Sequence, residues 1–461
     1  MISKEHIHFF TEKLGDRAIV NLEICKEYGS DETEDLNFPP SIVLKPITTR
    51  EVSLILAYCN QHELPITPAG ARTGLSGGAL PQHHGILMSL EKLNTIIQID
   101  EDNLQVTTEP GVITEVLQNA VKERGLFYPP DPASRGSCFI GGNIAENSGG
   151  PKAVKYGVTK DYVLNLEVVL PNGDVIWTGA NVLKNSTGYN LTQLMIGSEG
   201  TLGVVTKIVL RLIPHPKHTM LMLVPFKSIH GACQAVSSIF KAGITPSGME
   251  FMERDAILYT QRFINDYSLV LEEDDEAHLL IEVDGMEEEK LFQECESITE
   301  VLMAYDIGEI LFAESEAQKN ALWNVRRKVG EAVKTQSIYK EEDTVVPRYH
   351  LPELLQVVKS LGLEYGFHSV CYGHAGDGNL HINILKEEMD DETWKNDIPK
   401  AITKLFTTVV ELGGTISGEH GIGLVQKPYI SIAIQKEPLF IMRGIKNVFD
   451  PKNILNPGKI F

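Results

Sequence analysis

The chain has 461 residues, of which 43% are hydrophobic and 22% charged, and its formal net charge at pH 7 is −21. Because this length exceeds the size at which one hydrophobic core keeps growing, we expect two domains. The negative charge excludes nucleic acid as a partner, since its phosphates would be repelled, and it argues against docking on anionic lipid.

Cysteine usage and hydropathy indicate the compartment. The six cysteines lie far apart and form no C-x-x-C pair. This spacing excludes a readable iron–sulfur or zinc-ribbon motif and predicts reduced thiols. The first residues contain no apolar signal core, and no apolar run approaches the roughly 18 residues of a membrane span. We therefore expect a cytoplasmic protein without a transmembrane segment.

The first distinctive stretch is glycine-rich and runs from Pro68 to Gly78. A strand over 41–44 and a helix over 49–60, capped by Thr49, precede it. Its four glycines would let backbone N–H groups converge on a phosphate. The spacing fits neither G-x-G-x-x-G nor a P-loop. The stretch thus predicts a phosphate-bearing ligand bound by another route, and a plain surface turn is the alternative.

A second region of small residues, 129–150, is predicted to be irregular. Strands at 86–88 and 104–107 and a helix over 114–124 separate it from the glycine-rich stretch. Two such regions in one half of a domain exceed what turns require. We expect one large ligand to lie along both.

The pattern changes after a proline-rich linker at 213–218. Before it, a hairpin over 164–178 and an alternating strand over 204–212 are expected. Beyond it, helices over 229–241 and 287–304 lie between short strands. This pattern predicts an α+β domain with one face of its sheet covered, and we place the domain boundary at the linker.

Two histidines flank a glycine-containing break, Gly373 to His381. On one continuous strand, His374 and His381 would point to opposite faces of a sheet. The break at 375–378 can reverse the chain and bring both imidazoles together. Two convergent imidazoles suggest a metal site, although a lone histidine is usually structural.

A third metal ligand is offered by Glu419. It is followed by His420, which could face a substrate if the loop twists. Two histidines and one carboxylate leave coordination positions open, which suits catalysis better than a closed structural site. Zinc, manganese, iron(II) and cobalt all fit this ligand set.

Arg326 and Arg327 lie at the basic end of a predicted helix. They could clamp a substrate carboxylate or form an exposed basic face, and the sequence leaves both open.

The blocks from Pro68 to Lys459 resemble, in order, those of a known group. They are Pro68-Ala69-Gly70, Tyr128 to Pro132, Gly141-Gly142-Asn143, Lys155-Tyr156-Gly157, Gly197 to Gly203, Gly373 to His381, Gly418 to Gly421 and Asn456 to Lys459. They resemble the FAD-linked oxidase superfamily of vanillyl-alcohol oxidase and p-cresol methylhydroxylase, in its D-2-hydroxyacid dehydrogenase branch. That branch includes D-lactate dehydrogenases, the flavin subunit of glycolate oxidase and D-2-hydroxyglutarate dehydrogenase.

The resemblance implies an α+β fold in three segments. Residues 1–215 would form a two-part FAD-binding domain of the p-cresol methylhydroxylase type. Residues 216–413 would form an α+β substrate domain with an antiparallel sheet and the metal site, and residues 414–461 would return to the FAD domain. Since members with covalent flavin carry a histidine in the glycine loop and this loop has none, FAD is expected to be held noncovalently.

The resemblance also implies the site residues. His374, His381 and Glu419 would bind a divalent metal, with zinc as the first choice. Arg326, Asn383, His420 and Lys340 would contact the substrate, and His420 and Arg326 would act in catalysis. FAD would contact Pro68, Ala69, Gly70, Arg72, Thr73, Gly74, Leu75, Ser76, Pro130, Asp131, Ser134, Gly141, Gly142, Asn143, Ser148, Gly149, Tyr156, Gly157, Glu199, Gly200, Gly203, Val204 and Asn456.

The carboxylate clamp departs from the pattern of the hydroxyglutarate enzymes. The hydroxyglutarate enzymes resemble this chain in the arginine that Arg326 matches, but they carry a threonine where this chain has Gly330. They also carry a Y-K-x-D lysine that Lys340 matches only with a one-residue shift. We therefore expect oxidation of D-lactate or glycolate to the 2-keto acid. A D-2-hydroxyglutarate or D-malate dehydrogenase, an electron-relay flavoprotein subunit and a metallohydrolase are the alternatives.

The electron acceptor has no readable motif. Quinone, a cytochrome, an electron-transferring flavoprotein and oxygen all remain open as partners, and such a partner could bring the protein to a membrane surface. The oligomeric state is also open, with a homodimer among the assemblies considered.

Overall fold

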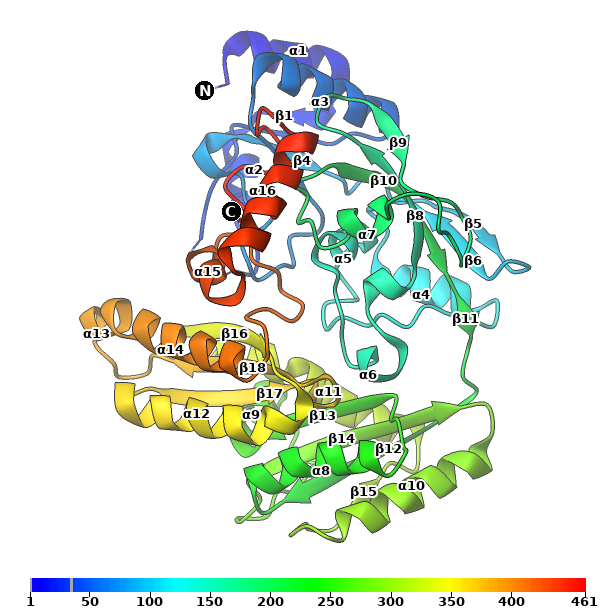
Figure 1. Cartoon of the computed structure of the whole chain (residues 1–461), viewed down its shortest axis with the longest axis vertical. Helices are drawn as coiled ribbons and strands as arrows, with labels where there is room; N and C mark the ends of the chain where they lie inside the picture. Colours follow the sequence, from blue (N-terminus) through cyan, green and yellow to red (C-terminus); the bar gives the residue numbers. More distant parts are fainter. Residues whose placement is uncertain (1, 34–35) are drawn as a thin grey trace. The chain divides into compact units, whose positions relative to one another are not determined.

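The computed structural model describes residues 2–33 and 36–461, which divide into two compact units. Unit 1 comprises Met1–Gly149, Val158–His215 and Glu419–Phe461, and unit 2 comprises Gly150–Gly157 and Pro216–Gly418. In Figure 1 the blue N-terminal part and the red C-terminal segment both belong to unit 1. The last segment of the chain therefore completes the unit with which the chain begins.

Unit 1 contains a small, mostly parallel sheet of order β1-β2-β4-β3. Its strands are β1 (Ala18–Ile19), β2 (Ile42–Leu44), β3 (Ile66–Ala69) and β4 (Ile86–Ser89). Residues of α1 (Lys4–Leu14) and α3 (Thr49–His62) share its apolar core. The helix predicted over 49–60 is confirmed, but Thr49 as its cap is wrong, because the side chain of Thr48 accepts the Glu51 N–H.

A second sheet in unit 1 is antiparallel, with order β5-β6-β10-β8-β9. Its strands are β5 (Ile96–Asp100), β6 (Gln105–Thr108), β8 (Val163–Val169), β9 (Val175–Trp177) and β10 (Val204–Arg211). The predicted hairpin and the predicted alternating strand are confirmed as β8–β9 and β10. The short strand β7 (Leu126–Phe127) pairs with β11 (Ile213–Pro214), and β11 lies within the expected linker.

A second prediction for unit 1 is also wrong. The region expected to be irregular contains the helix α5 (Ile140–Glu146). Ile140 and Ile144, one turn apart, are buried on the same side and fix this helix despite its glycines. The remaining helices of the unit are α2 (Leu22–Glu27), α4 (Thr114–Lys122), α7 (Leu191–Met195), α15 (Ile430–Ala433) and α16 (Lys436–Phe449).

The C-terminal segment attaches to the edge of β3. The Ile66 N–H donates to the Ile454 carbonyl at 2.8 Å, and the Asn456 N–H donates to the Ile66 carbonyl at 2.7 Å. Ile454 and Leu455 lie in the same apolar core as α1 and α3. The returning segment therefore extends the sheet from which the glycine-rich stretch emerges.

Unit 2 is built on a seven-stranded antiparallel sheet of order β15-β12-β14-β13-β17-β18-β16. Its strands are β12 (His218–Phe226), β13 (Gly248–Glu253), β14 (Ala277–Gly285), β15 (Leu311–Phe312), β16 (Tyr339–Val345), β17 (His368–Gly373) and β18 (Asn379–Leu385). Its helices are α6 (Ala153–Tyr156), α8 (Ile229–Lys241), α9 (Arg254–Ile264), α10 (Glu288–Leu302), α11 (Glu316–Lys334), α12 (Leu351–Tyr365), α13 (Asp391–Asn396) and α14 (Ile398–Glu411). The α+β class and the antiparallel sheet are confirmed.

Helices cover both faces of this sheet, so the expectation of a single covered face is wrong. One face packs against α9 and α11 in an apolar cluster that includes Leu280, Val329 and Tyr372. The other face meets α8, α10 and α12, of which α8 and α12 stand before the strands in Figure 1. Successive side chains of each strand point to opposite faces of the sheet. The side chains on the face covered by α11 form the cluster described below.

Among the described residues, no helix is long and apolar enough to cross a membrane. All six cysteines are free and buried.

Candidate active site

Unit 1 encloses a cavity of about 240 Å³. Its walls come from the glycine-rich stretch after β3, the start of α5 and the start of β10. The predicted FAD residues that line it are Pro68, Ala69, Gly70, Arg72, Thr73, Gly74, Leu75, Ser134, Gly141, Gly142, Asn143, Ser148, Glu199, Gly200, Gly203 and Val204. Both regions singled out in the sequence thus meet at one cavity.

The other predicted FAD residues do not line this cavity. They are Ser76, Pro130, Asp131, Gly149, Tyr156, Gly157 and Asn456. Asn456, for example, lies behind the wall and donates its side-chain N–H groups to the Gly78 and Glu199 carbonyls at 3.0 and 2.7 Å. Tyr156 belongs to unit 2, where its hydroxyl donates to Asp284 at 2.7 Å.

The glycines of the cavity test whether a cofactor fits. A Cβ added at Gly74 or Gly142 would meet no atom within 4 Å, so packing does not require glycine at either position. At Gly141, in contrast, a Cβ would lie 2.5 Å from the Pro110 Cβ. Bare backbone facing open space is what close approach to a phosphate requires. The cavity therefore fits the phosphate-bearing part of FAD.

Two carboxyls, those of Glu146 and Glu199, also line this cavity, and the sequence analysis missed Glu146. Glu199 is buried, whereas Glu146 is half-buried with its Oε2 atom enclosed. Glu199 accepts the N–H groups of Ile422 and Gly423 at 2.8 and 2.7 Å. Burial, reinforced by the charges of Glu199 and Asp31, raises the pKa of Glu146 well above its ordinary value. The signal in the sequence was an acidic residue inside a run of small residues.

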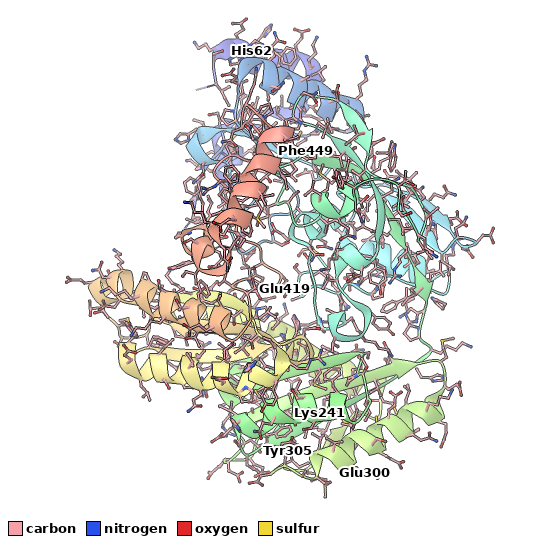
Figure 2. The ribbon with its side chains drawn as sticks, viewed as in Figure 1. His62, Lys241, Glu300, Tyr305, Glu419 and Phe449 are labelled. Carbon is pink, nitrogen blue, oxygen red and sulfur yellow. The ribbon has the colours of Figure 1, made fainter. Side chains whose placement is uncertain are left out.

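Glu419 and His420 line the same cavity. Glu419 lies in the loop that leads from α14 to α15 (Figure 2). The N–H groups that Glu199 accepts come from Ile422 and Gly423, two and three residues after His420. The predicted extended segment is a bend, so both side chains can contribute to one cavity.

In unit 2 the predicted chain reversal between His374 and His381 is confirmed. Strands β17 and β18 pair in antiparallel register on either side of the break, and the two rings lie 5.5 Å apart between centroids. A ring nitrogen of each histidine lies within 4.8 Å of one on the other. Both side chains are buried.

Behind His374 lies Glu250, a fully buried carboxylate in β13 that the sequence analysis missed. Its oxygens contact the His374 Nδ1 at 2.9 Å and an Arg326 terminal nitrogen at 2.6 Å. Burial alone would raise the pKa of Glu250, but the charges of His374 and Arg326 outweigh it and lower this pKa. An acidic residue among Met249, Phe251 and Met252 was the available signal.

Arg326 is not part of an exposed basic face. Its side chain is buried on the sheet, 5.0 Å from the Tyr372 ring centroid, and its Nε has no hydrogen-bond partner. Asn383 is also fully buried, and neither polar atom of its amide has a hydrogen bond of ordinary geometry, although the Tyr372 hydroxyl lies near it. Because unsatisfied buried polar atoms are costly, these groups are suited to meeting a polar ligand.

The register separates Lys340 from this cluster. Glu341 lies opposite Asn383 in the β16–β18 pair, whereas Lys340 lies opposite Ile384. Neighbouring residues of a strand point to opposite faces of the sheet, so the Lys340 side chain leaves the strand on the face opposite to the one that Arg326 covers. The structure brings Arg326, Asn383, His374 and His381 together, and it does not bring Lys340 to them.

Asp343 connects this cluster to the loop that precedes Glu419. It lies opposite His381 in the register, and one carboxylate oxygen accepts the Gly418 N–H at 2.7 Å. The same carboxylate accepts the Asn379 side-chain N–H at 2.7 Å. Since consecutive Cα atoms lie about 3.8 Å apart, the hydrogen bond that holds Gly418 also restricts the position of the Glu419 Cα atom.

The histidine pair passes a chemical test for a metal site. Glu250 at the Nδ1 of His374 would leave Nε2 as the coordinating nitrogen, and a carboxylate behind a ligating histidine is the usual supporting arrangement. Imidazole and carboxylate ligands suit zinc, manganese, iron and cobalt. The chemistry of the donors therefore fits a divalent cation.

The comparisons with known proteins agree with this organisation. Residues 40–179 match the family model described as the FAD binding domain, and residues 215–460 match that of the FAD linked oxidases, C-terminal domain. A D-lactate dehydrogenase of Anaerostipes hadrus is 38% identical over 464 residues, covering 100% of this chain and 98% of its own. Glycolate oxidase subunit GlcD of Bacillus subtilis is 40% identical over 438 residues, covering 94% of this chain and 92% of its own.

The fold agrees as well. The crystal structure of p-cresol methylhydroxylase with substrate bound matches with a TM-score of 0.81 at 17% identity, covering 98% of this chain and 96% of that one. With the cavity, the two family matches and relatives of nearly full length, the chain belongs to the FAD-linked oxidases of the p-cresol methylhydroxylase type.

Proposed function

We propose that this FAD-linked oxidoreductase is a divalent-metal-dependent dehydrogenase that oxidises a short D-2-hydroxy acid, D-lactate or glycolate, to the 2-keto acid. The observation that carries the proposal is the buried group formed by His374, His381, Arg326 and Asn383. It combines two neighbouring imidazoles with the guanidinium of Arg326, whose Nε has no hydrogen-bond partner, and the buried amide of Asn383. The relatives named D-lactate dehydrogenase and glycolate oxidase subunit support the same substrate class.

In this proposal His374 and His381 bind the metal together with Glu419. Glu250 orients His374. The hydrogen bond from the Gly418 N–H to Asp343 restricts the position from which the Glu419 side chain extends. We take zinc as the first candidate, with manganese, iron and cobalt as alternatives. When bound, the metal would lower the pKa of the substrate hydroxyl, as metals lower that of coordinated water from about 16 to about 7.

The remaining residues bind the acid and move its proton. Arg326 would pair with the substrate carboxylate, because a guanidinium binds a carboxylate through charge-assisted hydrogen bonds. Asn383 would line the substrate, and His420 would take the hydroxyl proton, since its ordinary pKa near 6.5 suits a general base at neutral pH. When bound, noncovalent FAD would accept the hydride from C2 at its N5. We also propose that the electrons then pass to a separate acceptor.

An anaerobic titration tests the proposal. The purified protein, with its flavin and metal content measured, is mixed with D-lactate, glycolate, D-malate or D-2-hydroxyglutarate, and bleaching of the flavin band is recorded. We expect D-lactate or glycolate to bleach it most efficiently. A colourless protein, or a flavin that none of these acids reduces, would contradict the proposal.

A matched pair of variants tests the metal. His374→Ala should lose the bound metal and slow bleaching by at least a hundredfold, because one of the proposed metal ligands is lost. His230→Ala removes an exposed histidine on α8 and should leave metal content and rate unchanged. Full turnover of His374→Ala after exhaustive chelation would show that the metal has no role.

A further inference from the structure

Helix α11 crosses the sheet of unit 2 and contacts a different strand at almost every turn. Successive residues along the helix meet β12, β14, β13, β17 and β16, which is the order of these strands across the sheet if β18 is left out. The contacts are Lys319 to the Thr219 carbonyl at 2.8 Å, Trp323 to Glu282 at 2.9 Å, Arg326 to Glu250 at 2.6 Å, Gly330 beside Tyr372, and Lys334 to Glu341 at 4.0 Å. The helix therefore fixes where positive and negative charges lie along this face.

One turn after Arg326 the helix has Gly330, and the Tyr372 hydroxyl lies beside this glycine. A Cβ at position 330 would lie 3.0 Å from the Tyr372 hydroxyl oxygen, tighter than ordinary contacts, so glycine is suited to this position. The hydroxyl donates to Glu341 Oε1 at 3.2 Å. The Tyr372 ring lies 5.0 Å from the Arg326 guanidinium and 5.2 Å from the His381 ring. One tyrosine therefore joins the cation, the metal-binding histidine and Glu341.

The charge of Glu341 is only weakly compensated by the described residues. Its second oxygen, Oε2, is buried without a hydrogen-bond partner, and its nearest cation, the Lys334 ammonium, is 4.0 Å away. The His381 Nδ1 lies 3.8 Å from Oε1. Glu250, in contrast, has Arg326 and His374 in direct contact. The negative charge of Glu250 is thus compensated by two cationic or donor groups in contact with it. The negative charge of Glu341, beyond Tyr372, is compensated only over longer distances.

We propose that Glu341, held by Tyr372, is a specificity-determining residue that excludes 2-hydroxy acids with a second carboxylate and selects those whose side chain is uncharged. This inference rests on the proposed function, since it assumes that a 2-hydroxy acid binds beside Arg326 and His381. An acid whose first carboxylate meets Arg326 would bring its second one into the field of Glu341.

The size of the effect follows from Coulomb's law. Two like charges about 4 Å apart in partly screened protein oppose binding by about a thousandfold. Lys334 and a bound cation beside His381 would weaken this repulsion. We therefore expect a discrimination of about tenfold or more, built from repulsion as well as from missing contacts.

The test separates charge from length by comparing D-2-hydroxyglutarate with its 5-amide. The two have the same carbon chain, but the amide is uncharged at the far end. Anaerobic bleaching of the flavin is measured for both acids and for D-lactate, using the flavin- and metal-loaded protein and resolving kcat from KM. The unaltered protein should favour the 5-amide over the dicarboxylate by about tenfold in kcat/KM, mainly through KM.

Glu341→Gln should remove most of this preference while retaining metal and activity on D-lactate. Its matched control is Glu331→Gln, which makes the same change on the exposed side of α11, where Glu331 pairs with Lys328 at 2.7 Å. The control should keep the tenfold preference. If Glu341→Gln does not fold, the comparison of the two acids in the unaltered protein still decides.

Three outcomes would overturn the inference. Equal use of the 5-amide and the dicarboxylate by the unaltered protein is one, and an unchanged preference in Glu341→Gln is the second. Loss of metal together with activity on every acid in Glu341→Gln is the third, because Glu341 would then be a ligand. Failure of the proposed function looks different, since then no 2-hydroxy acid would bleach the flavin of the unaltered protein.

Discussion

The cavity of unit 1 is walled by glycine-rich backbone and small side chains, whereas the cluster of unit 2 consists of charged and amide side chains buried on a sheet. Each contains a glutamate whose pKa its surroundings shift, Glu146 in unit 1 and Glu250 in unit 2. Arg326 and His374 hold the pKa of Glu250 below its ordinary value despite burial. Burial and the neighbouring acids Glu199 and Asp31 raise the pKa of Glu146. The surroundings thus favour the charged form of a glutamate at position 250 and the neutral form of a glutamate at position 146, depending on the partners of each.

The largest expected effect comes from removing the charge of Glu250. Glu250→Gln would leave Arg326 buried without its counter-ion, and breaking a buried ion pair in this way costs about 3–5 kcal/mol. Chemical denaturation should show a loss of unfolding free energy in this range, together with loss of metal. Glu300→Gln, at an exposed position on α10, is the control and should change stability by less than about 0.5 kcal/mol. A fully stable Glu250→Gln variant would show that the pair contributes nothing.

The second effect distinguishes Glu146 from Glu250 by its dependence on pH. Since the pKa of Glu146 is higher in the folded than in the unfolded protein, the folded state binds more protons above about pH 4.5. The free energy of unfolding should therefore fall as the pH rises through this window, by at most about 1.4 kcal/mol per pH unit. Burial raises the pKa of Glu199 as well, so Glu146→Gln, which stays neutral, should reduce this slope and be relatively more stable at pH 8 than at pH 5.

Denaturation curves of both proteins from pH 5 to pH 8, each with flavin bound, provide the measurement. The carboxyl oxygen Oε2 of Glu146 is enclosed without a hydrogen-bond partner, so an amide of the same shape should be tolerated. Parallel pH profiles of the variant and the unaltered protein would mean that Glu146 is ionised like an exposed acid.

The two regions also differ in how much the sequence revealed. The glycine-rich stretch, the hairpin and the reversal between His374 and His381 were predictable because turns and glycines act locally. The carboxyls Glu146 and Glu250 were not, because their roles depend on neighbours from distant strands and helices. Lys340 illustrates the limit, since its face depends on a register with β18 that no local pattern fixes. Helix α5 was missed because two buried isoleucines outweigh the low helix propensity of glycine.

The smallest effect on stability should come from the backbone of the unit 1 cavity, and it sharpens the contrast with unit 2. Gly142→Ala adds a Cβ that meets no atom within 4 Å, and alanine favours a helix over glycine by about 1 kcal/mol. The protein without flavin should therefore be as stable as before or slightly more stable, yet it should retain less FAD. Gly141→Ala is the opposite case, because its Cβ would lie 2.5 Å from Pro110 and should lower stability before any flavin is added. Flavin content after dialysis and denaturation of the flavin-free proteins separate the two. If Gly142→Ala kept its full flavin content, the open space beside this glycine would not be the place where the cofactor approaches the backbone.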